Sequence, residues 1–321
     1  MLLLIKKLMS YKYIFGPVIS RRIGISLGVD LVPPKNCTLN CVYCEIGKTS
    51  NLINNIEEFF PVSDILKELK EYLDKNPKLD YITFSGAGEP LLYSKIGEII
   101  SFIKTNYKNY KVCLITNGTL LFEKAVRDSV KNVDLIMPSL DAVSTDVFNK
   151  INRPHTDVKA NEIIEGIKLF KKESSSIMWL EVFIIPGIND NESELTKLKE
   201  AIKLINPDRV QINSLDRPGT ESWVEPANNE KLNEILNFFK PLNVEIIAKN
   251  FQKKADSSNN ANLENEIISA IKRRPCTLDD LVNMTGKNID EIDDILSVLI
   301  NNNVIDKKTQ DRGAFYCHIL K

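Results

Sequence analysis

The sequence contains little histidine, no long apolar run and no excess of charge of either sign. Only two of its 321 residues are histidines, His155 and His318, and neither belongs to a zinc-binding motif. The apolar run Met1–Ile5 is far too short to cross a bilayer or to form the core of a signal peptide. The formal net charge is −1, so no overall field attracts the chain to nucleic acid or to an anionic membrane. These absences predict a cytoplasmic protein, for which both Met1 and Met9 are open as the native start.

Cysteine is present but unevenly distributed. Three of the six cysteines fall within eight residues, and three are scattered: the six are Cys37, Cys41, Cys44, Cys113, Cys276 and Cys317. A disulfide framework would need a secreted context, of which the sequence shows no sign. Clustered thiols in a reducing compartment indicate a metal site. We expect Cys276 and Cys317 to be small buried residues, and Cys113 to lie inside a core strand.

The composition is that of a globular protein, with 43% hydrophobic and 26% charged residues. Apolar runs alternate with amphipathic stretches from about residue 23 to 247, which predicts repeated βα units and a parallel sheet. Six units favour an α/β fold that is an open, partial (β/α)6 barrel, with its active face just beyond the strand ends. The predicted strands are Ser26–Val32, Asp80–Ser85, Lys111–Thr116, Val133–Ser139, Met178–Ile185 and Arg209–Asn213, and the predicted helices are Val62–Asp74, Lys95–Asn106, Glu123–Ser129, Lys159–Glu173, Glu192–Leu204 and Asn229–Phe239.

A second, smaller domain is predicted at the C-terminus. Residues 249–262 are polar and aperiodic, which indicates a linker between a barrel domain (1–248) and the small domain (263–321). Three helical patterns follow, the second opening with the capping box Thr277-x-x-Asp280. Two short strands around a polar tip at residues 307–313 complete the pattern. Three helices and a hairpin predict a winged helix-turn-helix. The helices are Leu263–Lys272, Thr277–Met284 and Asn288–Asn301, and the strands are Val304–Ile305 and Ala314–Ile319.

The three clustered cysteines follow the first predicted strand in the spacing C-x-x-x-C-x-x-C. Three thiolates on one short loop hold three irons of a [4Fe–4S] cubane and leave the fourth iron open, as a catalytic site requires. The alternative is structural zinc, which would need a fourth cysteine or histidine near a second short pair. Iron–sulfur is the interpretation that we adopt for Cys37, Cys41 and Cys44.

This motif, with an aromatic Tyr43 before the last cysteine, resembles the signature of the radical S-adenosylmethionine superfamily. The resemblance implies a partial (β/α)6 barrel in which the amino and carboxylate groups of S-adenosylmethionine bind the open iron. It further implies an enzyme whose cluster breaks the cosubstrate with one electron, and a 5′-deoxyadenosyl radical that abstracts hydrogen from a substrate.

Further motifs at predicted strand ends resemble the cosubstrate-binding segments of that superfamily. The glycine-rich turn after the second strand resembles its "GGE" motif, although Ala87 separates the glycines. Taken alone, such a turn is usually just a turn, Asn117-Gly118 is typical of a tight turn, and Ser139 and Asp141 of a helix N-cap. Their coincidence at four strand ends favours binding. The resemblance assigns the cosubstrate to Gly86, Gly88, Glu89, Asn117, Ser139, Asp141 and Ile188.

A narrower resemblance covers roughly residues 14–247. The segments Phe15–Asp30, Ile151–His155 and Asn213–Pro218 are similar to a subgroup known as wyosine-synthetase-like Fe–S oxidoreductases. Wyosine synthases modify tRNA and use a second cysteine cluster. This sequence has no second cysteine triplet, so that specific activity is not expected and the substrate is left open.

Several arginines of the barrel segment lie in loops or at strand entries. Guanidinium groups there would suit a phosphate or carboxylate on the substrate, whereas pairing with carboxylates such as Asp216 or Glu89 is an equally good interpretation. His155 is a candidate acid–base group or a loop histidine without a role. The arginines are Arg21, Arg22, Arg153 and Arg217.

The charge of the predicted winged domain argues against sequence-specific DNA binding, because its third helix carries four acidic residues. We therefore expect an enzyme that acts on an unidentified substrate, with tRNA or a peptide as candidates, and that takes electrons from a reductant such as ferredoxin or flavodoxin. The alternative function is a non-catalytic Fe–S redox sensor that regulates transcription through the winged domain.

Overall fold

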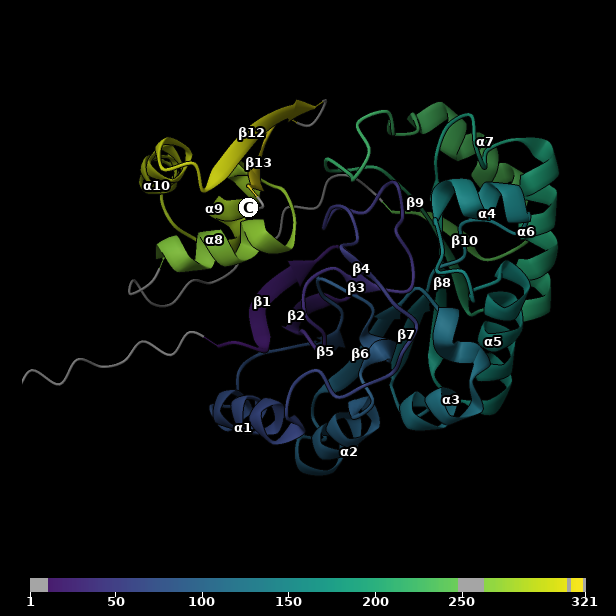
Figure 1. Cartoon of the computed structure of the whole chain (residues 1–321), viewed down its shortest axis with the longest axis horizontal. Helices are drawn as coiled ribbons and strands as arrows, with labels where there is room; N and C mark the ends of the chain where they lie inside the picture. Colours follow the sequence, from purple (N-terminus) through teal and green to yellow (C-terminus); the bar gives the residue numbers. More distant parts are fainter. Residues whose placement is uncertain (1–10, 248–262, 311–312, 320–321) are drawn as a thin grey trace, which may run out of the picture.

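Eight strands form one open sheet in a computed structural model that describes residues 11–247, 263–310 and 313–319 (Figure 1). Its six inner strands are those predicted from the sequence, and each pairs in parallel with the next one along the chain. Successive residues such as Val112, Cys113 and Leu114 in β6 are fully buried, as expected for a sheet covered on both faces. The predicted parallel sheet is confirmed. The inner strands are β2 (Gly24–Val29), β5 (Tyr81–Phe84), β6 (Lys111–Thr116), β7 (Leu135–Pro138), β8 (Ile177–Ile184) and β9 (Arg209–Ser214).

Two edge strands were not predicted. β1 (Ile14–Ser20) is antiparallel to β2, and β10 (Val244–Ile246) is parallel to β9. The Gly16-Pro17 pair interrupts the alternation of β1, and the register shifts there between Phe15 and Val18, so no period of two was visible. β1 and β10 end the sheet order, which leaves the described sheet open rather than closed into a full barrel.

Helices cover the outer face of the sheet (Figure 1). Their apolar residues recur with helical spacing, as Ile163, Ile167 and Phe170 of α5 illustrate, and all three are buried. The six predicted helices are confirmed to within one residue at each end, and α4 is additional. The helices are α1 (Val62–Leu73), α2 (Ile96–Asn106), α3 (Lys124–Val130), α4 (Thr145–Ile151), α5 (Ala160–Glu173), α6 (Glu192–Ile205) and α7 (Asn229–Phe239), with 3₁₀ turns at Pro90–Leu92 and Thr119–Phe122.

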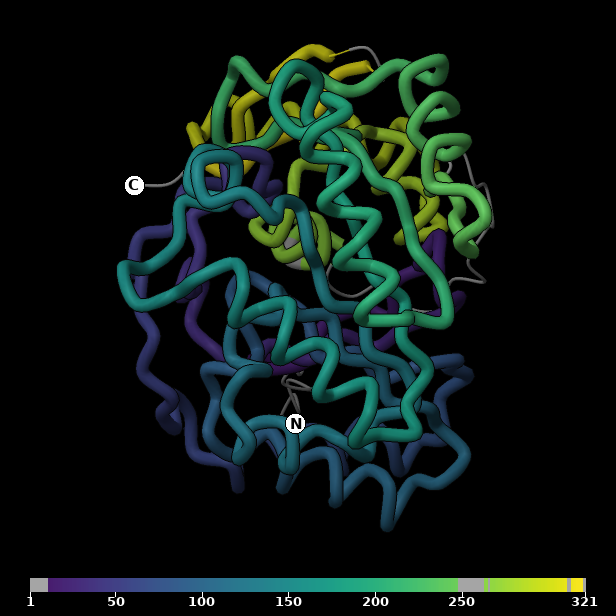
Figure 2. The backbone as a smooth tube through the Cα atoms, turned by 90° about the vertical axis from the view of Figure 1, so that its right-hand side faces the viewer, coloured from purple at the N-terminus to yellow at the C-terminus, as the bar shows by residue number. Residues whose placement is uncertain are grey.

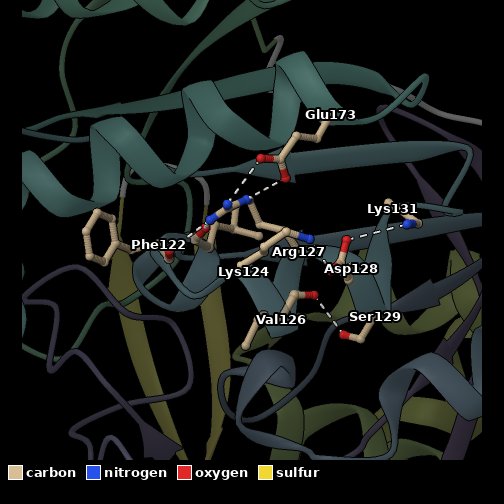
Figure 3. A network of polar contacts seen from close by, with 9 residues as sticks. Phe122, Lys124, Val126, Arg127, Asp128, Ser129, Lys131 and Glu173 are labelled. Atoms are coloured by element: carbon tan, nitrogen blue, oxygen red, sulfur yellow. Dashed lines mark hydrogen bonds and ion pairs between the residues drawn. The ribbon is translucent and has the colours of Figure 1, made fainter.

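A buried arginine fastens α3 to α5 (Figure 3). Arg127 Nε lies 2.8 Å from Glu173 Oε2, and its Nη1 donates to the carbonyl oxygens of Leu121 and Phe122 at 2.9 and 2.8 Å. The Arg127 side chain is 6% exposed. Its charge is therefore compensated inside the helical layer, and its role is to hold the fold together.

Three helices and a small sheet make up the C-terminal segment (residues 263–319). The predicted capping box of α9 is confirmed, because Thr277 and Asp280 exchange both hydrogen bonds. β12 extends farther than predicted, so the polar tip is shorter than residues 307–313. Residues 249–262, predicted as a linker, lie outside the described residues. The elements are α8 (Leu263–Arg273), β11 (Cys276–Thr277), α9 (Leu278–Thr285), α10 (Ile289–Asn301), β12 (Ile305–Gln310) and β13 (Gly313–His318), with the sheet order β11-β13-β12.

The C-terminal segment has its own apolar core and packs against the carboxyl end of the parallel sheet. Arg217, just beyond β9, donates to the Pro275 carbonyl at 2.7 Å and to Asp280 at 2.5 Å. Arg273 of α8 donates to Asp30, just beyond β2, at 3.1 Å. In both views the C-terminal segment (yellow) lies at the upper end and α1 and α2 at the lower end (Figures 1 and 2). Among the described residues, no helix is long and apolar enough to cross a membrane.

Candidate functional site

The cysteine loop follows β2 and is held in place by two sets of backbone contacts. Within the loop, β3 (Asn36–Cys37) pairs with β4 (Asn51–Leu52). From outside, the segment after α4 runs along the loop: Asn40 N donates to Asn152 O and Val42 N to Ile151 O, both at 2.9 Å. The loop that carries Cys37, Cys41 and Cys44 is thus fixed at the carboxyl end of the sheet, as the βα pattern predicted.

The three thiols share an apolar, half-buried setting. Burial raises the pKa of each thiol and is the largest of the causes that act on it. The pKa of Cys37 is raised to about 12. The sulfurs nevertheless receive hydrogen bonds, since Leu39 N lies 3.5 Å from Cys37 Sγ and the Cys44 sulfur accepts from backbone N–H groups. Such a setting disfavours bare thiolates and suits them once iron supplies positive charge.

The cysteine geometry does not match a single metal ion. A tetrahedral zinc ion brings its sulfurs to about 3.8 Å from one another, since each Zn–S bond is about 2.3 Å long. Among residues 11–247, 263–310 and 313–319, no three thiol, imidazole or carboxylate groups are placed to hold one ion. A cubane bonds each cysteine to a different iron, so its three sulfurs are spread more widely. Three cysteine donors suit a cubane whose fourth iron is left open.

A cavity beside the cysteine loop unites three of the predicted cosubstrate residues. Asn117 lies at the end of β6, and Ser139 and Asp141 lie just beyond β7, so neighbouring parallel strands deliver all three to one place. Asn152 also reaches the cavity, and its buried Oδ1 has no hydrogen-bond partner within the part of the chain that the structure describes. An unsatisfied buried acceptor at a cavity wall fits a ligand that donates hydrogen bonds. The lining residues are Leu39, Tyr43, Asn117, Ser139, Leu140, Asp141, Ala142, Phe148, Asn152 and Ile163.

Asp141 is the charged centre of this cavity. Its carboxylate accepts hydrogen bonds from Tyr43 OH at 2.5 Å, Asn152 Nδ2 at 2.8 Å and Phe183 N at 3.0 Å. Burial nevertheless raises the pKa of Asp141 to about 6. Tyr43 stacks on Phe183 with ring centroids 3.8 Å apart, which fixes the phenol that donates to Asp141. Asp141 is therefore not the helix N-cap considered above, a position that Ser144 occupies for α4.

Glu89 lies behind the cavity wall. Its oxygens accept from Thr116 Oγ1 at 2.6 Å, Asn117 N at 2.8 Å and Leu91 N at 3.0 Å, and burial raises its pKa to about 7. The carboxylate is 3% exposed and is engaged by its own chain, so here it braces the Asn117 turn. Asn117 Oδ1 in turn accepts from Thr119 N, so the tight-turn interpretation also holds.

Gly86 and Gly88, in the turn between β5 and Glu89, are explained by close packing. A Cβ at Gly86 would lie 1.7 Å from Asp30 Oδ1, and one at Gly88 would lie 2.4 Å from the Asn36 carbonyl oxygen. Neither glycine is among the cavity-lining residues, and neither is Ile188, which is 9% exposed and packs beside Phe183. These three predicted residues flank the cavity and do not line it.

The four loop arginines predicted to bind either a substrate anion or carboxylates of the chain are paired with carboxylates. None of these pairs involves Glu89. His155 is beside the exposed Asp157, with 3.5 Å between Nδ1 and Oδ2. Cys113 and Cys276 are buried as predicted, whereas Cys317 is only half-buried. The pairs are Arg21–Asp216, Arg22–Glu181, Arg153–Glu221 and Arg217–Asp280.

Comparison with known proteins agrees with this geometry. A model described as "Radical SAM superfamily" matches residues 31–198. A UPF0026 protein of Methanocaldococcus jannaschii is 31% identical over 96% of this chain and 96% of its own length. A protein of Brachyspira hyodysenteriae named GTPase Obg is 33% identical over 92% of this chain, which spans only 44% of that relative.

Among solved structures, a radical SAM methyltransferase from Sphaerobacter thermophilus superposes with a TM-score of 0.53 at 16% identity, covering 69% of this chain and 66% of that one. At this identity the likeness concerns the fold alone. The superfamily match includes the cysteine loop and the cavity residues, and the similarity to the Methanocaldococcus jannaschii protein covers nearly the whole chain. The chain belongs to the radical SAM superfamily of enzymes, whose members use a [4Fe–4S] cluster and S-adenosylmethionine.

Proposed function

We propose that Cys37, Cys41 and Cys44 ligate one [4Fe–4S] cluster and that the adjoining cavity binds S-adenosylmethionine. The observation that carries the proposal is the meeting of the cysteine loop with the polar ends of β6 and β7, where Asn117 Nδ2 lies 3.4 Å from Cys37 Sγ and Tyr43 OH donates to Asp141. When bound, the cluster would supply the electron that cleaves S-adenosylmethionine into methionine and a 5′-deoxyadenosyl radical, and this radical would take a hydrogen atom from the substrate. A radical SAM enzyme requires a reductant for this step, and we propose a ferredoxin or flavodoxin.

The residues around the cavity would bind and orient the cosubstrate. The Asp141 carboxylate, the Ser139 hydroxyl and the Asn117 and Asn152 amides offer acceptors and donors for hydroxyl, ammonium and carboxylate groups. The turns that carry these groups would be fixed by residues that do not line the cavity, namely Glu89, Gly86 and Gly88. Ile188 would support the aromatic pair of Tyr43 and Phe183.

For the C-terminal segment we propose a winged-helix domain that holds the substrate, a tRNA or a peptide, near the cysteine loop. Its elements occur in the order expected for that fold. Its anchor points, Asp30 and Arg217, lie beyond the ends of β2 and β9, on the side of the cysteine loop. Lys307 and Lys308 on the exposed edge strand β12 give this domain a basic edge.

The test is anaerobic reconstitution of the full chain followed by reduction with dithionite and addition of S-adenosylmethionine. We expect about four irons per chain and formation of 5′-deoxyadenosine. Cys41→Ala should lose both, whereas the matched control Cys317→Ala, which alters a half-buried cysteine outside the site, should keep both. Retention of the cluster in Cys41→Ala, or failure of the loaded wild type to bind S-adenosylmethionine, would contradict the proposal.

A further inference from the structure

Two asparagine side chains point their amide groups at the sulfurs of the cysteine loop. Asn117 Nδ2 lies 3.4 Å from Cys37 Sγ, and Asn152 Nδ2 lies 3.4 Å from Cys41 Sγ. Both separations are within hydrogen-bond range for sulfur. Asn117 belongs to a cosubstrate motif, but Asn152 comes from the segment after α4, to which sequence analysis assigned no role.

The orientation of both amides is fixed by their other partners. Asn152 Nδ2 also faces Asp141 Oδ2 at 2.8 Å, and a carboxylate only accepts hydrogen bonds, so the atom there is the nitrogen. Asn117 Oδ1 faces Thr119 N at 3.0 Å, and a backbone N–H only donates, so the other end of that amide is the nitrogen. Each amide therefore presents N–H, and not the carbonyl oxygen, to a sulfur.

Asn152 is held in this position by its own backbone. Its carbonyl oxygen accepts from Asn40 N at 2.9 Å, and its backbone N–H donates to Phe148 O at 2.8 Å in the last turn of α4. The side chain is 3% exposed, so water does not compete for the amide. The contact between Asn152 and Cys41 thus joins two segments 111 positions apart by a rigid connection.

Hydrogen bonds to the sulfurs of an iron–sulfur cluster influence its reduction potential. Reduction adds negative charge, part of which resides on the ligand sulfurs, and an N–H dipole aimed at a sulfur stabilises that charge. A donor of this kind therefore raises the potential, and its removal lowers it. A second donor on Cys37 acts in the same direction.

We propose that Asn152 is a positioning residue that tunes the cluster: its amide donates to the Cys41 sulfur and so makes the cluster easier to reduce. The proposal rests on the proposed function, because it requires Cys41 to be a cluster ligand. It gives the segment Ile151–His155 a role in setting the reduction potential of the cluster. It also couples the cluster to the cosubstrate cavity, since the same nitrogen donates to Asp141.

The experiment is a redox titration of the reconstituted full chain, monitored by the EPR signal of the reduced cluster, without S-adenosylmethionine. Asn152→Leu, which is similar in size and has no N–H, should shift the midpoint potential to a more negative value. The matched control is Asn40→Ala: Asn40 is also in the cysteine loop, but its side chain accepts from Thr49 N. Its midpoint potential should equal that of the wild type.

The outcomes separate the two proposals. A wild-type chain that assembles no [4Fe–4S] cluster overturns the proposed function and this inference with it. A wild-type cluster whose potential is unchanged in Asn152→Leu, or shifts equally in Asn40→Ala, overturns the role of Asn152 alone. If Asn152→Leu does not retain its irons, Asn152→Ala decides: a lowered potential supports the role, and an unchanged potential or a second failure to retain iron, which would mark a structural residue, refutes it.

Discussion

Replacing Arg217 should weaken the attachment of the C-terminal segment to the sheet. The Arg217 side chain is 5% exposed and donates to Asp280, which is 19% exposed, and to the Pro275 carbonyl. Burial alone would lower the pKa of Arg217, but the hydrogen bond that Arg217 donates to Asp280 and the charges of Glu45 and Asp280 hold this pKa above its usual value. Arg217 is therefore charged at neutral pH, and the pair is mostly desolvated.

The expected loss follows from that burial. Removing one partner of a buried ion pair costs about 3–5 kcal/mol, because the other charge stays buried without compensation. In Arg217→Met the apolar stem still packs, and Asp280 retains its hydrogen bond from Thr277 N at 3.0 Å. We therefore expect the lower end, a fall of about 3 kcal/mol in the free energy of unfolding of the full chain.

Equilibrium urea unfolding of Arg217→Met, Asp280→Asn and the double variant measures this as a double-mutant cycle. The control is Arg209→Met, since Arg209 is in β9 and pairs with Glu245 at 3.1 Å, but both side chains are about 40% exposed. That exposed pair should contribute less than about 1 kcal/mol. A coupling energy below about 0.5 kcal/mol between Arg217 and Asp280, or equal losses in Arg217→Met and Arg209→Met, would refute the reasoning.

Three further predictions concern the fold and the cavity. Arg127→Met should lower the free energy of unfolding by about 2–4 kcal/mol, because the Leu121 and Phe122 carbonyls lose their buried donor; a loss below about 1 kcal/mol in urea unfolding would contradict this. Thr277→Ala, which removes the cap of α9, should cost about 1 kcal/mol, and an unchanged unfolding curve would be the contrary result. Burial raises the pKa of Asp141 to about 6 from 3.8 in the unfolded chain, so the folded chain keeps a proton that the unfolded chain has lost between these values. The wild type should therefore lose about 2 kcal/mol relative to Asp141→Asn as the pH rises from 4 to 6, and the change should be complete above about pH 7; a rise in relative stability over that range would show the opposite shift.

Sequence alone determined the parallel sheet and the position of the cysteine loop. Alternating apolar periods mark the strands and helices locally, and the spacing of Cys37, Cys41 and Cys44 is a local property of eight residues. The meeting of Asn117 and Asp141 was also predictable, because both follow parallel strands, whose carboxyl ends share one edge of the sheet. By contrast, Gly16-Pro17 concealed β1, since it breaks the alternation on which strand prediction depends.

Only the tertiary structure decided which distant side chains meet. Asn152 faces the Cys41 sulfur, and Arg217 pairs with Asp280, across 111 and 63 positions of sequence. The same structure buries Glu89 behind the Asn117 turn, although its motif predicted a cosubstrate contact. Periodicity and spacing describe only neighbours along the chain. Hydrogen bonds and ion pairs of this kind depend on how loops approach one another after the sheet has formed, and no local pattern encodes that approach.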